Sequence, residues 1–69
     1  MSLYAIEDGS HTPKWYVKSI HKSLPYSYEH TTDTQLVQEY PSTTTAQADA
    51  DFCNTAFGDR FHVVPTPKH

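Results

Sequence analysis

The clearest hydrophobic pattern in the chain is helical and lies in its second half. Small apolar residues recur there at the spacing i, i+4, i+7 and i+11, which forms one stripe along a helix: Ala46, Ala50, Cys53 and Phe57. Thr44 and Gln47 have the spacing of a capping box, and Gly58 suits a C-terminal cap. The pattern predicts a helix from Thr45 to Phe57 whose narrow stripe packs closely on a sheet.

Elsewhere, apolar and polar residues alternate with the period of two that is typical of strands. The predicted strands are Ser2–Glu7, Lys14–His21, Gln35–Tyr40 and Arg60–Val64. Turn-forming residues fill positions 8–13. Pro25 interrupts residues 23–33, so this segment is either a short edge strand or a loop.

The order of these elements predicts one small α+β domain over residues 1–69, with residues 65–69 as a loose tail. Its fold would be β-β-β-α-β: a small antiparallel sheet of three to four strands with one helix packed on one face. The residues expected on the helix side are Leu3, Ala5, Trp15, Val17, Leu36, Phe61 and Val63. Those expected on the open side are Tyr4, Ile6, Tyr16, Ile20, Val37 and Val64. An open face this apolar is typical of an interface, although a slip of one residue reverses a strand's assignment.

The charge of the chain is modest in total but unevenly placed. The formal net charge is −3, and Lys14, Lys18 and Lys22 lie close together. Residues 23–59 contain no Lys or Arg but carry Glu29, Asp33, Glu39, Asp49, Asp51 and Asp59. A dominant basic surface for duplex DNA is therefore excluded. We expect a cytoplasmic protein, because the sequence contains a single cysteine, no secretory signal and no apolar run that would span a membrane.

The residues with reactive side chains have structural explanations. Cys53 lies on the predicted core stripe, which favours a small buried residue over a nucleophile. The five histidines match no metal-binding spacing, and His21 and His62 would approach each other only if their strands were neighbours. No glycine-rich phosphate loop is present. We therefore expect no enzyme activity, no cofactor, no metal and no small-molecule ligand.

Two binding hypotheses follow from the sequence. The first is a protein-binding module, typical of small bacterial or phage accessory and regulatory proteins, that acts through its open sheet face or an edge strand and forms a homodimer. Its candidate contact residues are Tyr4, Tyr16, Ile20, Val37, Phe52 and Val64. Phe52 lies off the helical stripe, so it either packs under residues 23–33 or is exposed as an anchor. The alternative is a single-stranded nucleic-acid binder that uses a strand face with Lys14, Tyr16, Lys18 and Lys22.

Overall fold

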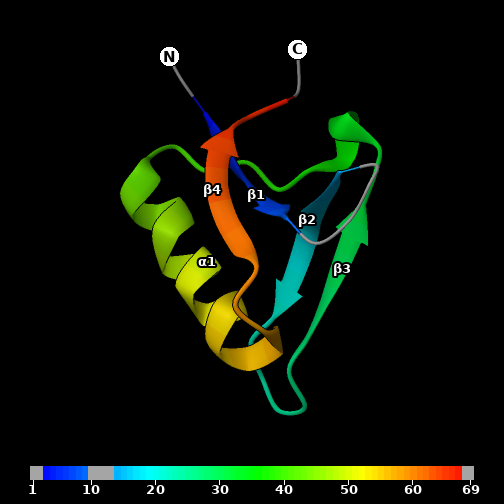
Figure 1. Ribbon diagram of the computed structural model, residues 1–69, viewed down its shortest axis with the longest axis vertical. Helices are drawn as coiled ribbons and strands as arrows, with labels where there is room; N and C mark the ends of the chain where they lie inside the picture. Colours follow the sequence, from blue (N-terminus) through cyan, green and yellow to red (C-terminus); the bar gives the residue numbers. More distant parts are fainter. Residues whose placement is uncertain (1–2, 10–13, 68–69) are drawn as a thin grey trace.

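The computed structural model describes residues 3–9 and 14–67. Its elements are β1 (Tyr4–Asp8), β2 (Trp15–His21), β3 (Ser27–Thr31), the 3-10 helix η1 (Thr34–Leu36), α1 (Thr43–Phe57) and β4 (Phe61–Pro65). The strands form one antiparallel sheet in the order β3-β2-β1-β4, and α1 packs against it beside β4 and β1 (Figure 1). The predicted β-β-β-α-β fold is confirmed.

The turn predicted over 8–13 lies partly outside the described residues, and so do residues 68–69 of the predicted tail. The tail prediction is wrong for its first residues, because Pro65 ends β4 and the Thr66 N–H donates to the Leu3 carbonyl at 3.0 Å. Among the described residues, no helix is both long and apolar enough to cross a membrane.

Helix α1 begins two residues earlier than predicted, because Ser42 is its N-cap. The Ser42 Oγ accepts a hydrogen bond from the Thr45 N–H at 3.3 Å. Gln47 was expected to reach back toward Thr44, but its Nε2 donates to Asp51 instead. The predicted stripe is confirmed, since its first three members are fully buried: Ala46, Ala50 and Cys53. The predicted stop is also confirmed, at a glycine whose φ of +125° L side chains rarely adopt: Gly58.

Strand β1 turns toward α1 the set of side chains that was predicted to lie on the open side. Directly opposed residues of neighbouring strands share a face, and Ile6 lies opposite Val63, which packs against the core under α1. Ile6 and Tyr4 therefore face α1, whereas Leu3 and Ala5 belong to the other side. The prediction is wrong because both alternate sets of residues in β1 are apolar. The larger Ile6 side chain fills more of the core than alanine would.

Strand β2 contains a bulge at Lys18 that reverses the faces of the residues after it. Val17 pairs with His30 and Ser19 with Glu29, so Lys18 has no opposite residue in β3. Val17 and Ile20 consequently both face α1, where Val17 is buried and Ile20 packs against the core. The prediction that Ile20 lies on the open side is wrong because the alternation of faces was continued along β2 without the extra residue of the bulge.

The strand predicted over Gln35–Tyr40 is replaced by η1 and an extended segment. The Asp33 Oδ1 accepts a hydrogen bond from the Gln35 N–H at 2.9 Å and caps η1. Leu36 is 49% exposed, so its predicted place in the core is wrong. Val37 is 4% exposed, so it is a buried residue and not the exposed contact residue that was predicted.

The segment after η1 lies between β1 and β2, which pair only at their adjoining ends. Tyr40 exchanges two backbone hydrogen bonds with Tyr4, of 2.9 and 2.8 Å. The Gln38 N–H donates to the Val17 carbonyl at 3.0 Å. The segment thereby satisfies backbone groups of both strands beyond the point where they separate. Tyr40 is also part of the core under α1.

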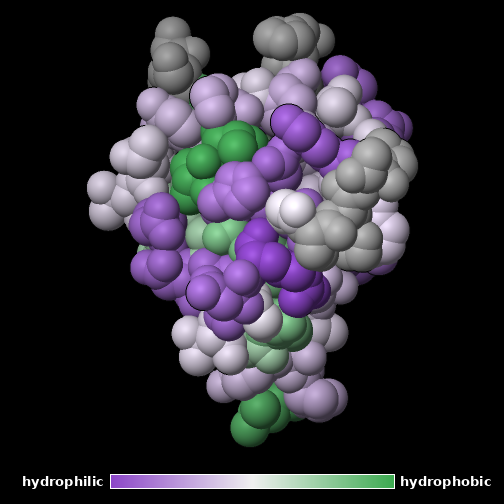
Figure 2. Space-filling view, in the orientation of Figure 1, coloured by the Kyte–Doolittle hydropathy of each residue, from purple (hydrophilic) through white to green (hydrophobic). Residues whose placement is uncertain are grey.

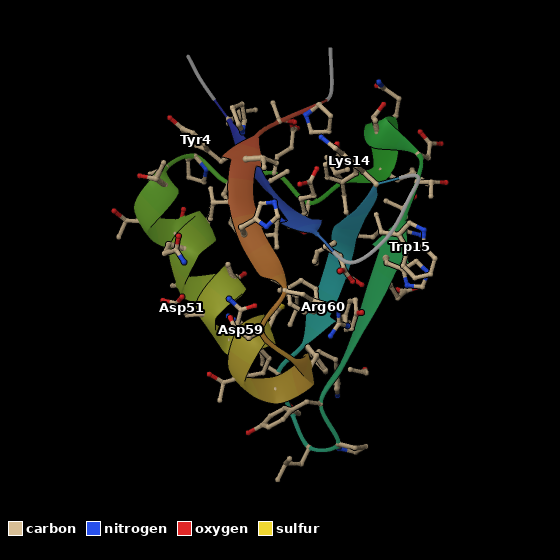
Figure 3. The ribbon with its side chains drawn as sticks, viewed as in Figure 1. Tyr4, Lys14, Trp15, Asp51, Asp59 and Arg60 are labelled. Carbon is tan, nitrogen blue, oxygen red and sulfur yellow. The ribbon has the colours of Figure 1, made fainter. Side chains whose placement is uncertain are left out.

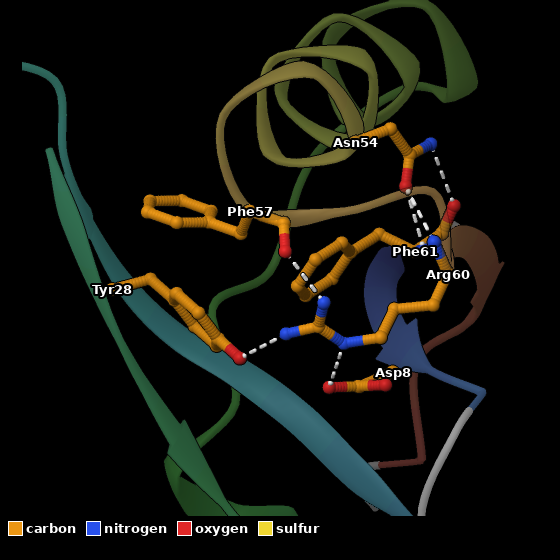
Figure 4. A network of polar contacts seen from close by, with 6 residues as sticks. All are labelled: Asp8, Tyr28, Asn54, Phe57, Arg60 and Phe61. Carbon is orange, nitrogen blue, oxygen red and sulfur yellow. Dashed lines mark hydrogen bonds and ion pairs between the residues drawn. The ribbon is translucent and has the colours of Figure 1, made fainter.

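Arg60 connects the end of α1 to two strands (Figure 4). Its Nε donates to Asp8 Oδ2 at 3.0 Å, its Nη1 to the Phe57 carbonyl at 2.7 Å and its Nη2 to Tyr28 Oη at 2.8 Å. Asp8 is 1% exposed, so its carboxylate needs this charge nearby. The hydrogen bond to Asp8 raises the pKa of Arg60 further above its usual high range.

Replacing Arg60 by Met should lower the free energy of unfolding by about 3 kcal/mol, because it removes the positive charge beside a buried carboxylate. Arg60→Lys keeps the charge but cannot reproduce the three-way contact, so we expect a smaller loss of about 1–2 kcal/mol. Urea unfolding at neutral pH measures both. Equal stability of the wild type and the two variants would contradict a structural role for this network.

Candidate functional site

The sheet face opposite α1 carries a row of polar residues that crosses all four strands. In order from β4 to β3 the row is His62, Glu7, Tyr16 and Thr31. His62 Nε2 lies 2.6 Å from Glu7 Oε1, and Lys14 Nζ lies 3.4 Å from Glu7 Oε2. Because the Glu7 side chain is only 10% exposed and is held from both sides, the centre of this face is already occupied by the protein's own side chains.

This face is not the broad apolar surface that the sequence predicted. Tyr16 and Val64 do lie on it, each partly exposed. The other predicted contact residues do not: Tyr4 and Ile20 face α1, Val37 is buried, and Phe52 packs elsewhere. Figure 2 shows a small hydrophobic area over the upper part of β4, in surroundings that are mostly hydrophilic.

Phe52 packs under the β2–β3 connection, the first of its two predicted alternatives. Its ring meets the Tyr26 ring edge-on, with centroids 5.1 Å apart, and the Lys22 ammonium lies 5.5 Å above it. Lys22 also forms an ion pair with Asp49 of α1. Phe52 therefore fixes the hairpin to the helix and is only partly exposed.

The lysines of the predicted nucleic-acid face do not lie on one face. Lys14 lies just before β2 (Figure 3) and pairs with Glu7 on the side opposite α1. Lys18 is the bulge residue, and Lys22 lies on the helix side beside Asp49. With two of the three lysines paired to carboxylates, the regular row of cations that would follow a phosphate backbone is not formed.

Cys53 has the environment of a core residue. It is fully buried, and burial, reinforced by the Asp49 carboxylate, raises the pKa of its thiol to about 11. Burial and a hydrogen bond to the same Asp49 raise the pKa of Tyr40 well above its usual range. His21 and His62 do not meet, because β1 lies between their strands. No group of three or more potential metal ligands occurs within residues 3–9 and 14–67.

The backbone hydrogen bonds of β4 show which of its residues point toward β1. The Gly9 N–H donates to the Arg60 carbonyl, and the Thr66 N–H donates to the Leu3 carbonyl, both at 3.0 Å. Because the directions of the backbone groups alternate along a strand, the even-numbered residues of β4 turn their N–H and C=O groups toward β1. The odd-numbered residues turn their backbone groups to the outer edge of the sheet.

That outer edge of β4 is closed by a side chain of α1. Asn54 Oδ1 accepts from the Phe61 N–H at 2.7 Å, and Asn54 Nδ2 donates to the Phe61 carbonyl at 3.0 Å (Figure 4). At the other end, Pro65 has no N–H to offer. Only Val63, between them, keeps both backbone groups directed outward, so an added strand would find few partners here.

The same reasoning gives the direction of the backbone groups in β2. The Val17 carbonyl accepts a hydrogen bond from Gln38 on the side of β2 that faces β1. The backbone groups of its neighbour Tyr16 therefore point the other way, toward Thr31, which lies opposite Tyr16 in β3.

Among the described residues, no strand or side chain pairs with the outer edge of β3. β3 is the end strand of the sheet and pairs with β2 alone among the described strands. Since the backbone groups of Thr31 point toward β2, those of Tyr28 and His30 point away from β2, to the outer edge. The sequence of β3, SYEHT, contains neither the proline nor the lysine that often protect such an edge. His30 is held in place by Trp15, whose ring stacks on it with centroids 3.7 Å apart.

A hollow of about 570 Å³ lies beside this edge, at the turn end of the β2–β3 hairpin. It is lined by Ser19, Ile20, His21, Pro25, Ser27, Tyr28 and Glu29. Ser19 lies opposite Glu29, and its Oγ donates to Glu29 Oε1 at 3.0 Å. Because the serine hydroxyl donates to a carboxylate and not to a histidine, the hollow lacks the arrangement of an activated nucleophile. Its lining contains one carboxylate, Glu29, and neither Lys nor Arg.

Comparison of the chain with protein-family models, with curated proteins and with solved structures found no match. The geometry of the sheet edges therefore provides the functional argument. At the β3 edge, the sequence singled out Glu29 as part of an acidic stretch and residues 23–33 as either a short edge strand or a loop. Their common signal was alternation after Pro25 without Lys, which is typical of an unprotected edge.

The thiol of Cys53 should be unreactive toward a disulfide reagent in the native protein and react fully after unfolding in urea. Its pKa is higher in the folded state, so its stabilising contribution is complete below pH 9 and is lost as pH rises toward 11. The loss should amount to about 3 kcal/mol. Cys53→Ala should remove this part of the decline and keep the part due to Tyr40. Rapid labelling of the native thiol would contradict the prediction.

Asn54→Ala should lower the free energy of unfolding by about 2 kcal/mol, because it leaves the Phe61 N–H and carbonyl without their partner. Amide hydrogen exchange at Phe61 should accelerate in the same variant. Thr55→Ala, on the exposed side of α1, is the matched control and should change neither quantity. Protection of the Phe61 amide that survives in Asn54→Ala would show that the edge is not closed by this side chain.

Proposed function

We propose that this protein is a small, non-enzymatic accessory or regulatory module that binds a partner polypeptide by adding the partner's strand to the outer edge of β3. The observation that carries the proposal is the difference between the two edges of the sheet. Asn54 and Pro65 close the edge of β4, whereas β3 keeps the backbone groups of Tyr28 and His30 directed outward. Strand addition to an exposed edge is a recurrent mode of peptide recognition.

The edge of β3 is suited to this role because its conformation is held before a partner arrives. The Trp15 ring stacks on His30 with an interplanar angle of 2°, and the Tyr28 ring packs edge-on against Phe61 at 5.3 Å. Tyr28 also accepts a hydrogen bond from Arg60. An edge whose side chains are already ordered loses less conformational entropy on binding. Each backbone hydrogen bond to the added strand would contribute about 1 kcal/mol.

A second copy of the chain is one occupant of this edge, and the homodimer predicted from the sequence would then form through β3. Two copies of β3 can pair antiparallel in several registers that place the outward backbone groups of one copy opposite those of the other. The register centred on Glu29 places two carboxylates directly opposite each other, which is unfavourable. The registers centred on Tyr28 or His30 avoid that contact. Light scattering over a range of protein concentrations measures this self-association.

His30→Pro should abolish strand addition, because proline removes an outward N–H without removing a hydrogen bond to β2. His30→Ala is the matched control, since it also loses the stack on Trp15 but keeps the N–H. We expect extended peptides selected from a random library against the wild type to bind His30→Ala and not His30→Pro. Thermal unfolding checks that both variants are folded. Peptides retained equally by His30→Pro, with amide shifts outside β3, would overturn the proposal.

A further inference from the structure

We infer that the strand received at β3 carries a lysine or arginine opposite Glu29, so that the partner is an extended basic segment of another polypeptide. This inference rests on the proposed function, because it names the chemistry of the strand that the open edge would accept.

The position of Glu29 in the enlarged sheet is set by the direction of the backbone groups. Tyr28 and His30 would form the hydrogen bonds to the added strand, so Glu29 would stand between them in a non-hydrogen-bonded pair. Opposed side chains approach most closely in such pairs, with Cα atoms about 4.5 Å apart. The partner residue opposite Glu29 would share its face of the sheet, where an ammonium or guanidinium group reaches the carboxylate. The partner residue two positions further would stand opposite Ser27, over the hollow.

Glu29 differs in its charge balance from three carboxylates that the sheet and α1 hold in ion pairs. Glu7 pairs with Lys14, Asp8 with Arg60 and Asp49 with Lys22. Glu29 is exposed, and its hydrogen-bond donor is the neutral hydroxyl of Ser19, on one of its two oxygens. Within the described residues it forms no ion pair. The Ser19 contact holds the carboxylate in the lining of the hollow, and Oε2 is the oxygen that this contact leaves for a cation.

The surroundings of the edge reinforce a preference for a basic partner. β3 itself carries Glu29 and neither Lys nor Arg, and the Arg60 guanidinium that reaches Tyr28 is paired with Asp8. Ser19 lies opposite Glu29 in β2, and Lys18 precedes Ser19 in the chain. Lys18 is at the bulge, one strand away from the edge, and forms no ion pair with Glu29. The exposed Glu29 carboxylate therefore attracts positive charge to this edge.

A second copy of the chain cannot supply that charge from β3. In the registers that keep the hydrogen bonds in phase, the residue opposite Glu29 would be Ser27, Glu29 or Thr31 of the second copy. None of the three is a cation, and one register opposes two carboxylates. Charge complementarity thus favours a different, basic polypeptide over self-pairing.

The test uses three synthetic peptides with alternating threonine and valine that differ only at the central residue, which is Lys, Gln or Glu. Each is titrated into isotopically labelled protein, and binding is followed through the amide shifts of β3. We expect the wild type to bind the Lys peptide about tenfold more tightly than the Glu peptide, with the difference falling as salt rises. Glu29→Lys should reverse the order, and Glu29→Gln should remove the difference.

Asp51→Asn is the matched control for the loss of one carboxylate. Figure 3 places Asp51 on α1, across the molecule from β3, so this variant should preserve the order of the three peptides. Equal binding of all three peptides to the wild type, blocked by His30→Pro, would overturn the charge inference and leave strand addition in place. Failure of every peptide to bind would overturn both. A dimer formed through β3 that excludes the Lys peptide would also overturn the inference.

Discussion

The structure depends most on the short connection from α1 to β4, where three polar contacts fix how the chain reverses. Asn54 accepts from the N–H groups of both Arg60 and Phe61, and the Arg60 guanidinium caps the end of the helix through the Phe57 carbonyl. These contacts set where β4 begins. They also place Phe61 opposite Asp8, which fixes the register of β4 on β1 and brings the buried carboxylate to Arg60. That register determines which side chains of β1 face α1.

The same connection determines which edge of the sheet remains open. Asn54 uses both polar atoms of its amide on the backbone of Phe61, so closing the β4 edge and positioning β4 are one arrangement. No corresponding side chain of the described residues takes up the outward groups of β3. Protection of one edge with ordered, outward-facing groups on the other is the arrangement that the proposed strand addition at β3 requires. The difference between the two edges is thus a consequence of how the helix is tied to the sheet.

Elements with a strong single pattern could be predicted from the sequence, and those with competing patterns could not. The small-residue stripe of α1 and the alternation of Phe61 and Val63 admitted one reading, and both were found as predicted. In β1 both alternate sets are apolar, so only the partner strand decides which is buried. The bulge at Lys18 leaves no local mark in the composition. The candidate edge was foreseen only as a segment after Pro25, because an edge is defined by sheet order, which depends on long-range pairing.

The distribution of charge explains why the edge of β3, and not the open face of the sheet, is the better place for recognition. On the open face, Glu7 already has His62 and Lys14 as neighbours, so an incoming charged group would have to displace an internal contact. At the edge, backbone groups and the Glu29 carboxylate are presented together without such competition. Backbone pairing accepts almost any sequence, whereas a single fixed charge beside it discriminates between partners. Affinity and selectivity would therefore come from adjacent but chemically separate features of one strand.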